Sequence, residues 1–367
     1  MLKSTYKLPP LPPAVDLETV AVLKALATAN RALAELKGRA TAIPNQGILI
    51  DTLALQEAKA SSEIENIVTT QDELFQADLF PEAPGSPAAK EVARYRDAVK
   101  LGFNRMRAAD GIISNNMLVE MFRLLKERED GFRRTPGTAL KNDHTGDLVY
   151  VPPQDGVEIL ALMAALERFI NDDDACTLDP LIKMALIHHQ FESIHPFPDG
   201  NGRIGRILNV LYLSRTGLLE IPILYLSRHI TRTKGEYYRL LQAVRDTNGA
   251  PDAWEEWVLY ILHAVAETAK ATLALVDGIR QQMADVKKRM RDELPKLYSQ
   301  DLLNNLFRHP YTRIDYVVQD LGVTRQTAAK HLDTLAKAGF VLKHTAGKHN
   351  YYINTDLVRL FMDGAGE

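Results

Sequence analysis

Twelve consecutive residues, from His195 to Arg206, carry the side chains needed to handle a metal-bound polyphosphate beside a general base. His195 titrates near neutral pH and can take a proton from a hydroxyl. Asp199 can hold Mg²⁺, which prefers one or two carboxylates together with phosphate oxygens. Arg203 and Arg206 are three residues apart on a predicted helix, so both face one side of its N-terminal turn, where free N–H groups favour anions. The spacing therefore predicts a phosphate-binding catalytic loop.

The glycines of this stretch, Gly200, Gly202 and Gly205, allow backbone N–H groups to approach an anion closely. A Walker P-loop is excluded because Gly-x-x-x-x-Gly-Lys-Ser/Thr is absent, and a dinucleotide-binding turn is excluded because no predicted strand precedes it. The alternative is a tight Pro/Gly loop followed by a helix with two surface arginines. The conjunction of base, carboxylate, glycines and arginines favours the functional interpretation.

The whole chain sets broad limits. Its 367 residues exceed one ordinary domain, so we expect two or three. A composition of 46% hydrophobic and 25% charged residues is typical of a globular protein, and the net charge of −3 argues against a uniformly basic nucleic-acid-binding surface. Cys176 is the single cysteine, which excludes an intrachain disulfide. Neither a membrane-spanning run nor a signal peptide is recognised, so we expect no membrane association and a cytoplasmic location.

Apolar periodicity predicts a mainly α protein. The N-terminal helices are expected at 16–38, with Gly38 as C-cap, and at 49–67. A long helix is expected at 254–290, broken near Gly278. A hairpin is expected within 131–153, with its turn at 143–146 and a strand at 147–151.

The last 70 or so residues differ in style from the rest. Three predicted helices are followed by two strands around Gly347, which is the order of a winged helix-turn-helix. The third helix, which begins at Thr324, would be the recognition helix. We predict four regions: an N-terminal helical region (1–89), a catalytic core (90–265), a helical linker (266–295) and a winged helix-turn-helix (296–367).

The pattern His-x-Phe-x-Asp-Gly-Asn-Gly-Arg-x-x-Arg resembles the signature of Fic-domain proteins, and each fixed position matches. The similarity extends through Tyr150-Val-Pro-Pro153 and Tyr237-Tyr238, over roughly residues 90–265. The resemblance implies a Fic-type helical core with a short β-hairpin flap. Most members transfer AMP from ATP to a Ser, Thr or Tyr hydroxyl of a protein, whereas others move phosphate, UMP or phosphocholine. The Gly-Asn-Gly version of the loop is associated with AMP transfer.

The resemblance implies a role for each position of the motif. His195 would be the general base, and Asp199 would hold Mg²⁺ against the α- and β-phosphates of ATP. Asn201 would contact the α-phosphate. The ATP-binding turn as a whole would comprise Gly200, Asn201, Gly202, Arg203, Ile204, Gly205 and Arg206, with the two arginines on the β- and γ-phosphates.

Two further regions of the site are implied by the same resemblance. Tyr237 or Tyr238 would border the adenine. The flap residues Leu148, Val149, Tyr150 and Val151 would align a target peptide by strand addition. Some relatives carry an adenine-side Asn where this chain has Arg245, so a contact of that kind is not expected here.

A second segment, Ser61-Ser-Glu-Ile-Glu65-Asn66, resembles the inhibitory Ser/Thr-x-x-x-Glu-Gly/Asn helix of this family. Ser61 and Glu65 are four residues apart and share a helix face. A Glu65 carboxylate paired with Arg206 would remove the charge that should hold the γ-phosphate. Glu65 would therefore line the ATP site and inhibit the enzyme in cis.

The leading hypothesis is an autoinhibited protein adenylyltransferase that uses Mg·ATP, modifies protein hydroxyls, including its own, and releases pyrophosphate. One alternative is a nucleotide-sensing DNA-binding regulator. Another is a Fic enzyme that removes AMP or uses a different nucleotide donor. The resemblance also allows a homodimer.

Basic residues occur on the predicted recognition helix and wing, which would be the DNA-facing elements: Arg325, Lys330, Lys337, Lys343, His344, Lys348 and His349. Winged helices also bind proteins, so DNA and protein partners both stay open. His188 and His189 are adjacent on a predicted helix and point in different directions, so we expect core residues instead of metal ligands.

Overall fold

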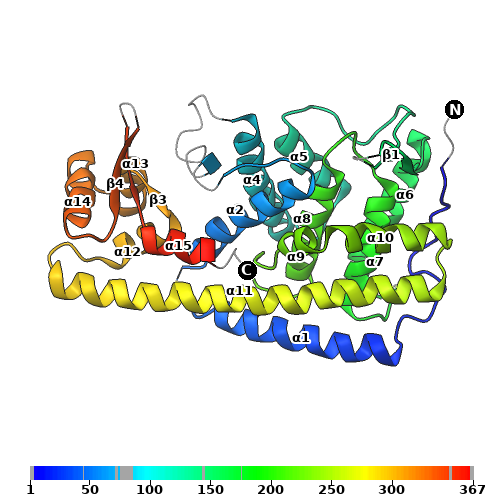
Figure 1. Cartoon of the computed structure of the whole chain (residues 1–367), viewed down its shortest axis with the longest axis horizontal. Helices are drawn as coiled ribbons and strands as arrows, with labels where there is room; N and C mark the ends of the chain where they lie inside the picture. Colours follow the sequence, from blue (N-terminus) through cyan, green and yellow to red (C-terminus); the bar gives the residue numbers. More distant parts are fainter. Residues whose placement is uncertain are drawn as a thin grey trace. The chain divides into compact units, whose positions relative to one another are not determined.

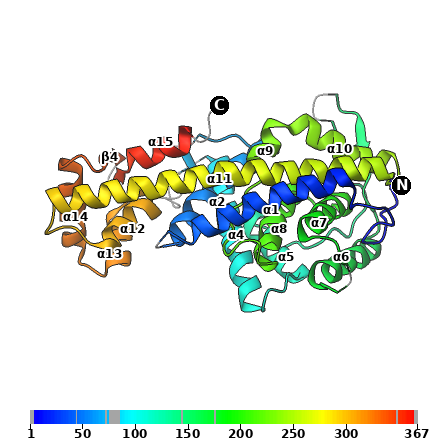
Figure 2. The ribbon, with the colours of Figure 1, turned by 90° about the horizontal axis from the view of Figure 1, so that it is seen from below.

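The computed structural model describes residues 4–43, 45–70, 73–74, 86–142, 145–174, 176–346 and 349–363. The protein is mainly helical with two small antiparallel sheets, as the sequence predicts (Figures 1 and 2). The predicted turn residues Asp143, His144 and Gly347, the wing residue Lys348, and most of the loop near residues 81–87 lie outside the described residues.

The chain forms two compact units, each assembled from three stretches. The first unit comprises Met1–Ala34, Glu57–Val68 and Arg94–Ala269, and the second comprises Glu35–Gln56, Thr69–Ala93 and Lys270–Glu367. Four helices contribute residues to both units: α1 (Val20–Ala40), α2 (Gly47–Ile64), α4 (Pro87–Ala108) and α11 (Pro251–Glu293). The predicted region boundaries at 89, 265 and 295 stay predictions.

The core of the first unit is a pair of buried helices. The elements that lie wholly in this unit are α5 (Asn115–Lys126), β1 (Leu140–Lys141), β2 (Leu148–Tyr150), α6 (Gly156–Asn171), α7 (Pro180–Ile194), α8 (Asn201–Arg215), α9 (Ser227–Arg232) and α10 (Lys234–Asp246). From Leu181 to Ile194 every residue of α7 is buried, and most of α8 is buried as well. A helix that is buried on all sides belongs to a core, so α7 and α8 form the support on which the motif is mounted (Figure 1).

The predicted hairpin is present but short. Strand β2 pairs with β1 in antiparallel register, with an irregularity between Leu140 and Lys141. Leu148 and Val149 are exposed, whereas Tyr150 and Val151 are buried. One end of the flap is therefore fixed to the core and the other faces solvent.

The second unit contains the predicted order of three helices and two strands. Its own elements are α12 (Gln300–Arg308), β3 (Tyr311–Thr312), α13 (Ile314–Leu321), α14 (Arg325–Lys337), β4 (Leu342–Ala346), β5 (His349–Ile353) and α15 (Thr355–Asp363). Gly322 ends α13 with a φ of 65°, and the Thr324 side chain caps α14 by accepting a bond from the Thr327 N–H. The sheet order β3-β5-β4 shows a third strand that the sequence analysis missed, together with the helices α9 and α15.

Two sequence predictions are wrong. Helix α11 is unbroken at Gly278, because a Cβ there would lie 2.8 Å from the Leu360 Cδ1 atom: the glycine admits a neighbouring side chain and does not end the helix. Helix α1 continues past Gly38 to Ala40, and the backbone of Gly38 does not adopt a positive φ.

Helix α1 runs beside α11 in both views (Figures 1 and 2). Thr19, just before α1, donates to Glu255 in the first turn of α11 at 2.9 Å. Among the described residues, α11 is also the one helix that is long and apolar enough to cross a membrane. Its most apolar stretch of 18 residues has a mean hydropathy of 1.3. Half of that stretch is buried inside the protein, and the core helix of a soluble protein can have the same length and composition.

Candidate active site

The catalytic motif is the turn that joins α7 to α8. His195 is the C-cap of α7 with a φ of 50°, and Gly200 precedes α8 with a φ of 74°. The left-handed conformation at both positions reverses the chain sharply. The end of α7 and the beginning of α8 are thereby brought together, with His195 at one side and the arginines of α8 at the other.

Phe197 anchors this turn. Its ring stacks on Phe122 at 4.4 Å and lies 5.1 Å from Phe132. The Asn201 amide closes the loop: its Oδ1 accepts from the Phe197 N–H at 2.7 Å and its Nδ2 donates to the Phe197 carbonyl at 2.8 Å. We infer that this amide shapes the loop, and its contact to an α-phosphate stays a prediction.

His195 is held neutral. Burial, together with the positive charges of Arg133 and Arg245, lowers its pKa to about 3. Its Nδ1 is buried and has no hydrogen-bond partner in the described part of the chain. A neutral imidazole is the form that accepts a proton.

Arg133 is a site residue that the sequence analysis missed. Its Nε donates to the His195 carbonyl at 2.7 Å, and its Nη2 donates to the carbonyls of Pro153 and Ile194 at 2.9 and 3.2 Å. The side chain thus ties the end of the flap to the last turn of α7. The role of this buried arginine could not be predicted from the sequence, because its partners are backbone carbonyls that no sequence spacing reveals.

Arg245 contributes to the same tie from α10. Its Nε donates to Ser193 Oγ at 3.0 Å and its guanidinium lies 4.0 Å from the centre of the Tyr150 ring. Tyr150 in turn donates to the Ser193 carbonyl at 2.7 Å. Arg245 therefore packs beneath the flap.

The Asp199 carboxylate is exposed and bonds to Lys126 Nζ at 2.7 Å. Its own loop also contributes, because the Gly200 N–H donates to Oδ1 at 2.6 Å. The hydrogen bonds and charge of Lys126, with help from Arg203, outweigh desolvation and lower the pKa of Asp199. The group is thus an ionised, accessible carboxylate that already attracts a cation.

This donor set fits Mg²⁺ bound through one carboxylate and phosphate oxygens. Within the described ranges, no group of three or more His, Cys, Asp or Glu side chains could hold a metal ion. A single carboxylate at the edge of an anion site is what a nucleotide-bound magnesium ion requires.

Arg206 is bound by α2. Its Nε donates to Ser61 Oγ at 2.8 Å, and its Nη2 donates to the Ser61 carbonyl at 2.8 Å and to Glu65 Oε1 at 2.9 Å. Burial alone would lower the pKa of Arg206, but Glu65 and nearby tyrosines raise it, so the guanidinium stays charged. The predicted pairing of Glu65 with Arg206 is present in the structure.

Gly202 makes room for this pair. A Cβ at that position would lie 2.3 Å from Glu65 Oε1 and 2.8 Å from Arg206 Nη1. Gly205 has a comparable role one turn later, where a Cβ would lie 2.7 Å from Glu192 Oε1. The glycines therefore allow side chains of α2 and α7 to reach the backbone of α8.

Glu192 is a buried carboxyl on α7, and its Oε1 has no hydrogen-bond partner among the described atoms. Burial raises its pKa to about 7, an effect that Arg206 opposes and Glu65 reinforces. Arg203 is buried to 1% exposure beside this turn, and Ile204 is fully buried. The motif thus places two guanidiniums in a low-dielectric pocket, where they act strongly on an anion.

The two tyrosines of α10 have different environments. Tyr237 is buried, and its hydroxyl bonds to His188 Nε2 at 2.9 Å. Tyr238 is 43% exposed. Of the two residues predicted to border the adenine, Tyr238 has the ring that a ligand can reach.

His188 and His189 lie in the core, as predicted. His188 stacks on Trp257 at 6.0 Å, and His189 lies edge-on to Trp254 at 4.6 Å. Burial lowers the pKa of His188 to about 3. Both rings serve packing and hydrogen bonding.

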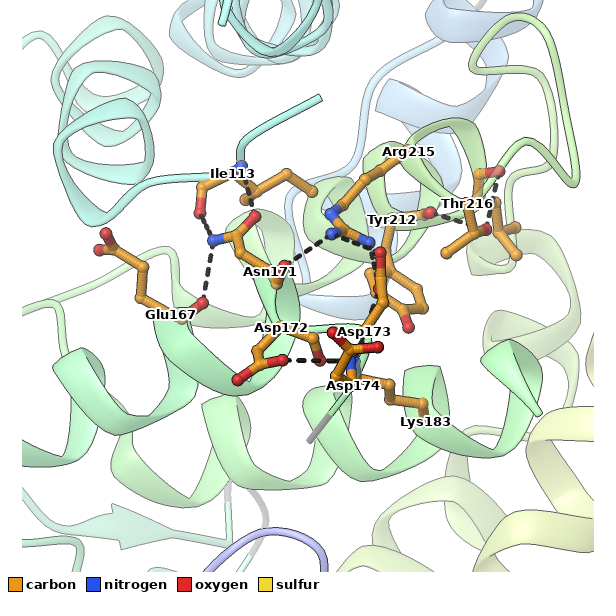
Figure 3. A network of polar contacts seen from close by, with 11 residues as sticks. Ile113, Glu167, Asn171, Asp172, Asp173, Asp174, Lys183, Tyr212, Arg215 and Thr216 are labelled. Atoms are coloured by element: carbon orange, nitrogen blue, oxygen red, sulfur yellow. Dashed lines mark hydrogen bonds and ion pairs between the residues drawn. The ribbon is translucent and has the colours of Figure 1, made fainter. Parts of the chain in front are cut away.

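A separate polar network lies at the opposite ends of α7 and α8 (Figure 3). Arg215 bonds to both oxygens of Asp173, at 2.8 and 3.1 Å, and to the Asn171 carbonyl at 2.9 Å. Lys183 donates to the Asp172 carbonyl at 2.9 Å. A cavity of about 390 Å³ adjoins these residues, lined also by Cys176 and Tyr212. Because His195 lies at the other ends of these helices, this network fixes the α6–α7 connection and contributes no group to the motif.

The basic residues of the second unit are partly engaged. Arg325 pairs with Asp315, and Lys343 Nζ bonds to Asp333 Oδ1 at 2.7 Å. The side chain of His349 lies outside the described side chains. These pairs reduce the net positive charge that α14 and the hairpin offer to a nucleic acid.

Comparison with known proteins agrees with this architecture. The family model described as Fic/DOC family N-terminal matches residues 23–104, and the one described as Fic/DOC family matches residues 113–213. A third, described as protein adenylyltransferase SoFic-like, C-terminal domain, matches residues 282–357. The chain belongs to the Fic/DOC family.

Curated relatives include proteins named protein adenylyltransferase Fic from Drosophila sechellia and Drosophila melanogaster. Each is 30% identical over 134 residues, which are 36% of this chain and 25% of the relative. The aligned region therefore spans a quarter of the length of these relatives.

Solved structures show the same fold. A Fic family protein from Desulfovibrio desulfuricans aligns over 95% of this chain and 98% of its own, with a TM-score of 0.55 and 20% identity. Fic-1 from C. elegans aligns over 71% of this chain and 74% of its own, with a TM-score of 0.52 and 20% identity.

Proposed function

We propose that this protein is an adenylyltransferase that moves AMP from Mg·ATP to a Ser, Thr or Tyr hydroxyl of a protein, and that α2 holds it inactive. The observation that carries the proposal is the 2.9 Å ion pair between Glu65 and Arg206. Arg206 belongs to a motif in which every polar residue of the family signature is present. The name of the Drosophila relatives supports AMP transfer.

The reaction balances with the groups present. The target hydroxyl oxygen attacks the α-phosphorus of ATP, the bond from that phosphorus to the bridging oxygen of the β-phosphate breaks, and pyrophosphate leaves. His195 takes the hydroxyl proton. Because its lowered pKa keeps the imidazole neutral across the physiological range, the base is ready without a prior deprotonation.

Asp199 would hold Mg²⁺, and Lys126 would give up its bond to that carboxylate when it does. The ion, when bound, supplies positive charge to the phosphate oxygens. Arg203 and Arg206 would stabilise the charge that develops on pyrophosphate, aided by the N–H groups at the start of α8.

Inhibition follows from competition for one guanidinium. Arg206 donates two hydrogen bonds to Ser61 of α2 and one to Glu65, directly after this helix, so it is not available to the γ-phosphate while Glu65 is in place. A nucleotide would then bind weakly or in a pose that places its α-phosphate wrongly. Withdrawal of Glu65 would restore the grip on the phosphates.

The flap would receive the target peptide. Leu148 and Val149 offer exposed backbone and apolar side chains at the end of the hairpin, and Tyr150 and Arg133 fix its base to residues 193–195. Strand addition of this kind reads the backbone, which is compatible with several protein targets, including a second copy of this chain. A cytoplasmic location remains an inference from the sequence.

The test is incorporation of label from ATP into protein by the Glu65→Gly variant. We expect transfer from α-labelled but not γ-labelled ATP, at least tenfold above the unaltered chain. Glu63→Gly is the matched control. Glu63 is exposed near the end of α2, and its variant makes the same exchange of glutamate for glycine two residues before Glu65.

Other results would favour the alternatives. Unchanged incorporation by Glu65→Gly would remove the inhibitory role of Glu65. Absence of transfer from any nucleotide, together with salt-sensitive DNA binding, would indicate a nucleotide-sensing regulator. Release of AMP from a modified target would indicate the reverse reaction.

A further inference from the structure

Glu57 is a buried carboxyl on α2, two turns before Glu65. Its Oε1 accepts hydrogen bonds from the Tyr95 hydroxyl of α4 at 3.0 Å and from the Ser227 hydroxyl at the start of α9. Its Oε2 is buried and has no hydrogen-bond partner in the described part of the chain. A carboxyl in this setting is costly to bury, so its hydrogen bonds are needed to offset the lost solvation.

The position of Glu57 relates directly to the inhibitory residues. Glu57 and Ser61 lie four residues apart on α2, and Glu65 follows four residues later, directly after the last residue of the helix. The last two bond to Arg206, and the first bonds to α4 and α9. A rotation or a shift of α2 by one residue would break all of these contacts together.

A second row of polar contacts runs beside the first. Thr231 Oγ1 of α9 donates to the Ala60 carbonyl at 3.2 Å, and Lys234 Nζ donates to Asn66 Oδ1 at 3.1 Å. Both are partly exposed and accessible to water. The contacts of Glu57 are fully buried, so their loss is not compensated by solvent.

We propose that Glu57 is a positioning residue for inhibition: its hydrogen bonds to Tyr95 and Ser227 hold α2 in the register that delivers Glu65 to Arg206. The inference rests on the proposed function, because it names what keeps the inhibitory carboxylate in place. This control acts within the chain itself and requires no further ligand.

The electrostatic setting supports this role. Burial raises the pKa of Glu57 to about 7, and the Ser227 hydrogen bond, the charge of Arg206 and the Tyr95 hydrogen bond oppose that rise. The two hydroxyls therefore stabilise the charged form of a buried group. Removal of either hydroxyl leaves the buried Glu57 carboxyl with one hydrogen bond fewer.

The test uses three variants: Ser227→Ala and Tyr95→Phe, which each remove one donor with little change of shape, and Glu57→Ala. Each is made in the unaltered chain and in the Glu65→Gly chain, with Glu63→Gln as the matched control on the exposed face of α2. Incorporation from α-labelled ATP is measured, with hydrogen exchange of the amides at 57–66 as a second measurement that needs no activity.

We expect Ser227→Ala and Tyr95→Phe to raise incorporation by about 5- to 30-fold in the unaltered chain and by less than about twofold in the Glu65→Gly chain. Exchange at 57–66 should quicken by a similar factor in both variants and stay unchanged in Glu63→Gln. Gains of equal size in both backgrounds, or unchanged exchange in folded Ser227→Ala and Tyr95→Phe, would overturn the proposal. If Glu65→Gly itself shows no transfer, the proposed function fails, and the exchange measurement still decides whether Glu57 holds α2.

Discussion

Helix α8 carries an arginine–carboxylate pair near each end, and the two pairs differ in almost every respect. Arg206 is 2% exposed and receives its carboxylate from Glu65, 141 residues earlier in the chain. Arg215 receives its carboxylate from Asp173, which is 42 residues earlier and 70% exposed. The first partner directly follows the end of α2, and the second lies in the loop that connects α6 and α7.

Under the proposed function, the first contact regulates the enzyme, whereas the second braces the fold. An exposed ion pair contributes little to stability, since water and salt compete with it. A buried guanidinium that loses its carboxylate is left with an unbalanced charge, which another anion can neutralise. Under the proposed function, the competing anion at the Arg206 end is the γ-phosphate of ATP, whereas no such ligand is proposed at Arg215.

The largest effect is expected for the base at the catalytic end. In the Glu65→Gly chain, His195→Ala should reduce AMP transfer by about 10²–10⁴-fold, because the proposed general base is then missing. Nucleotide affinity, measured by calorimetry, should change little. Efficient transfer by this variant would show that the base lies elsewhere.

The same substitution at the two arginines tests the comparison directly. In the Glu65→Gly chain, Arg206→Lys should lower transfer by about 10- to 100-fold, since an ammonium lacks the planar fork that binds phosphate oxygens. Arg215→Lys should leave transfer within about twofold. Equal losses at both positions would mean that the distal pair also supports the reaction.

The smallest effect is expected for the exposed carboxylate. Hydrogen bonds from Arg215 lower the pKa of Asp173, so the pair persists at neutral pH and weakens only as acid protonates the carboxyl. Asp173→Asn should reduce the free energy of unfolding by about 0–1 kcal/mol, measured by urea denaturation, without activating transfer. Activation by Asp173→Asn would identify a second inhibitory contact.

The sequence predicted the catalytic turn because all of its polar residues are contiguous. It also predicted Glu65, through the resemblance of residues 61–66 to the inhibitory helix of the Fic family. It could not predict Arg133, Lys126 or Glu57, because their partners are backbone carbonyls or residues distant in the chain. Such contacts arise from tertiary packing and leave no local pattern.

The errors in the fold have the same origin. Gly278 is a poor helix former, yet α11 continues through it because the side chain of Leu360 occupies the space beside it. The strand β3 has two residues, and its existence depends on pairing with β5 near the C-terminus. Neither feature could be predicted from the residues of the segment alone.

Helix α2 belongs to both compact units, since its residues up to Gln56 contribute to one and those from Glu57 onward to the other. Its first turns are fixed within the second unit by the 2.6 Å bond between Asp51 and Arg308 Nε. One helix thus contributes residues to two compact units. By thermodynamic reciprocity, a ligand of the second unit that favours release of α2 would increase the affinity of the first unit for ATP, and ATP would increase the affinity for that ligand by the same factor.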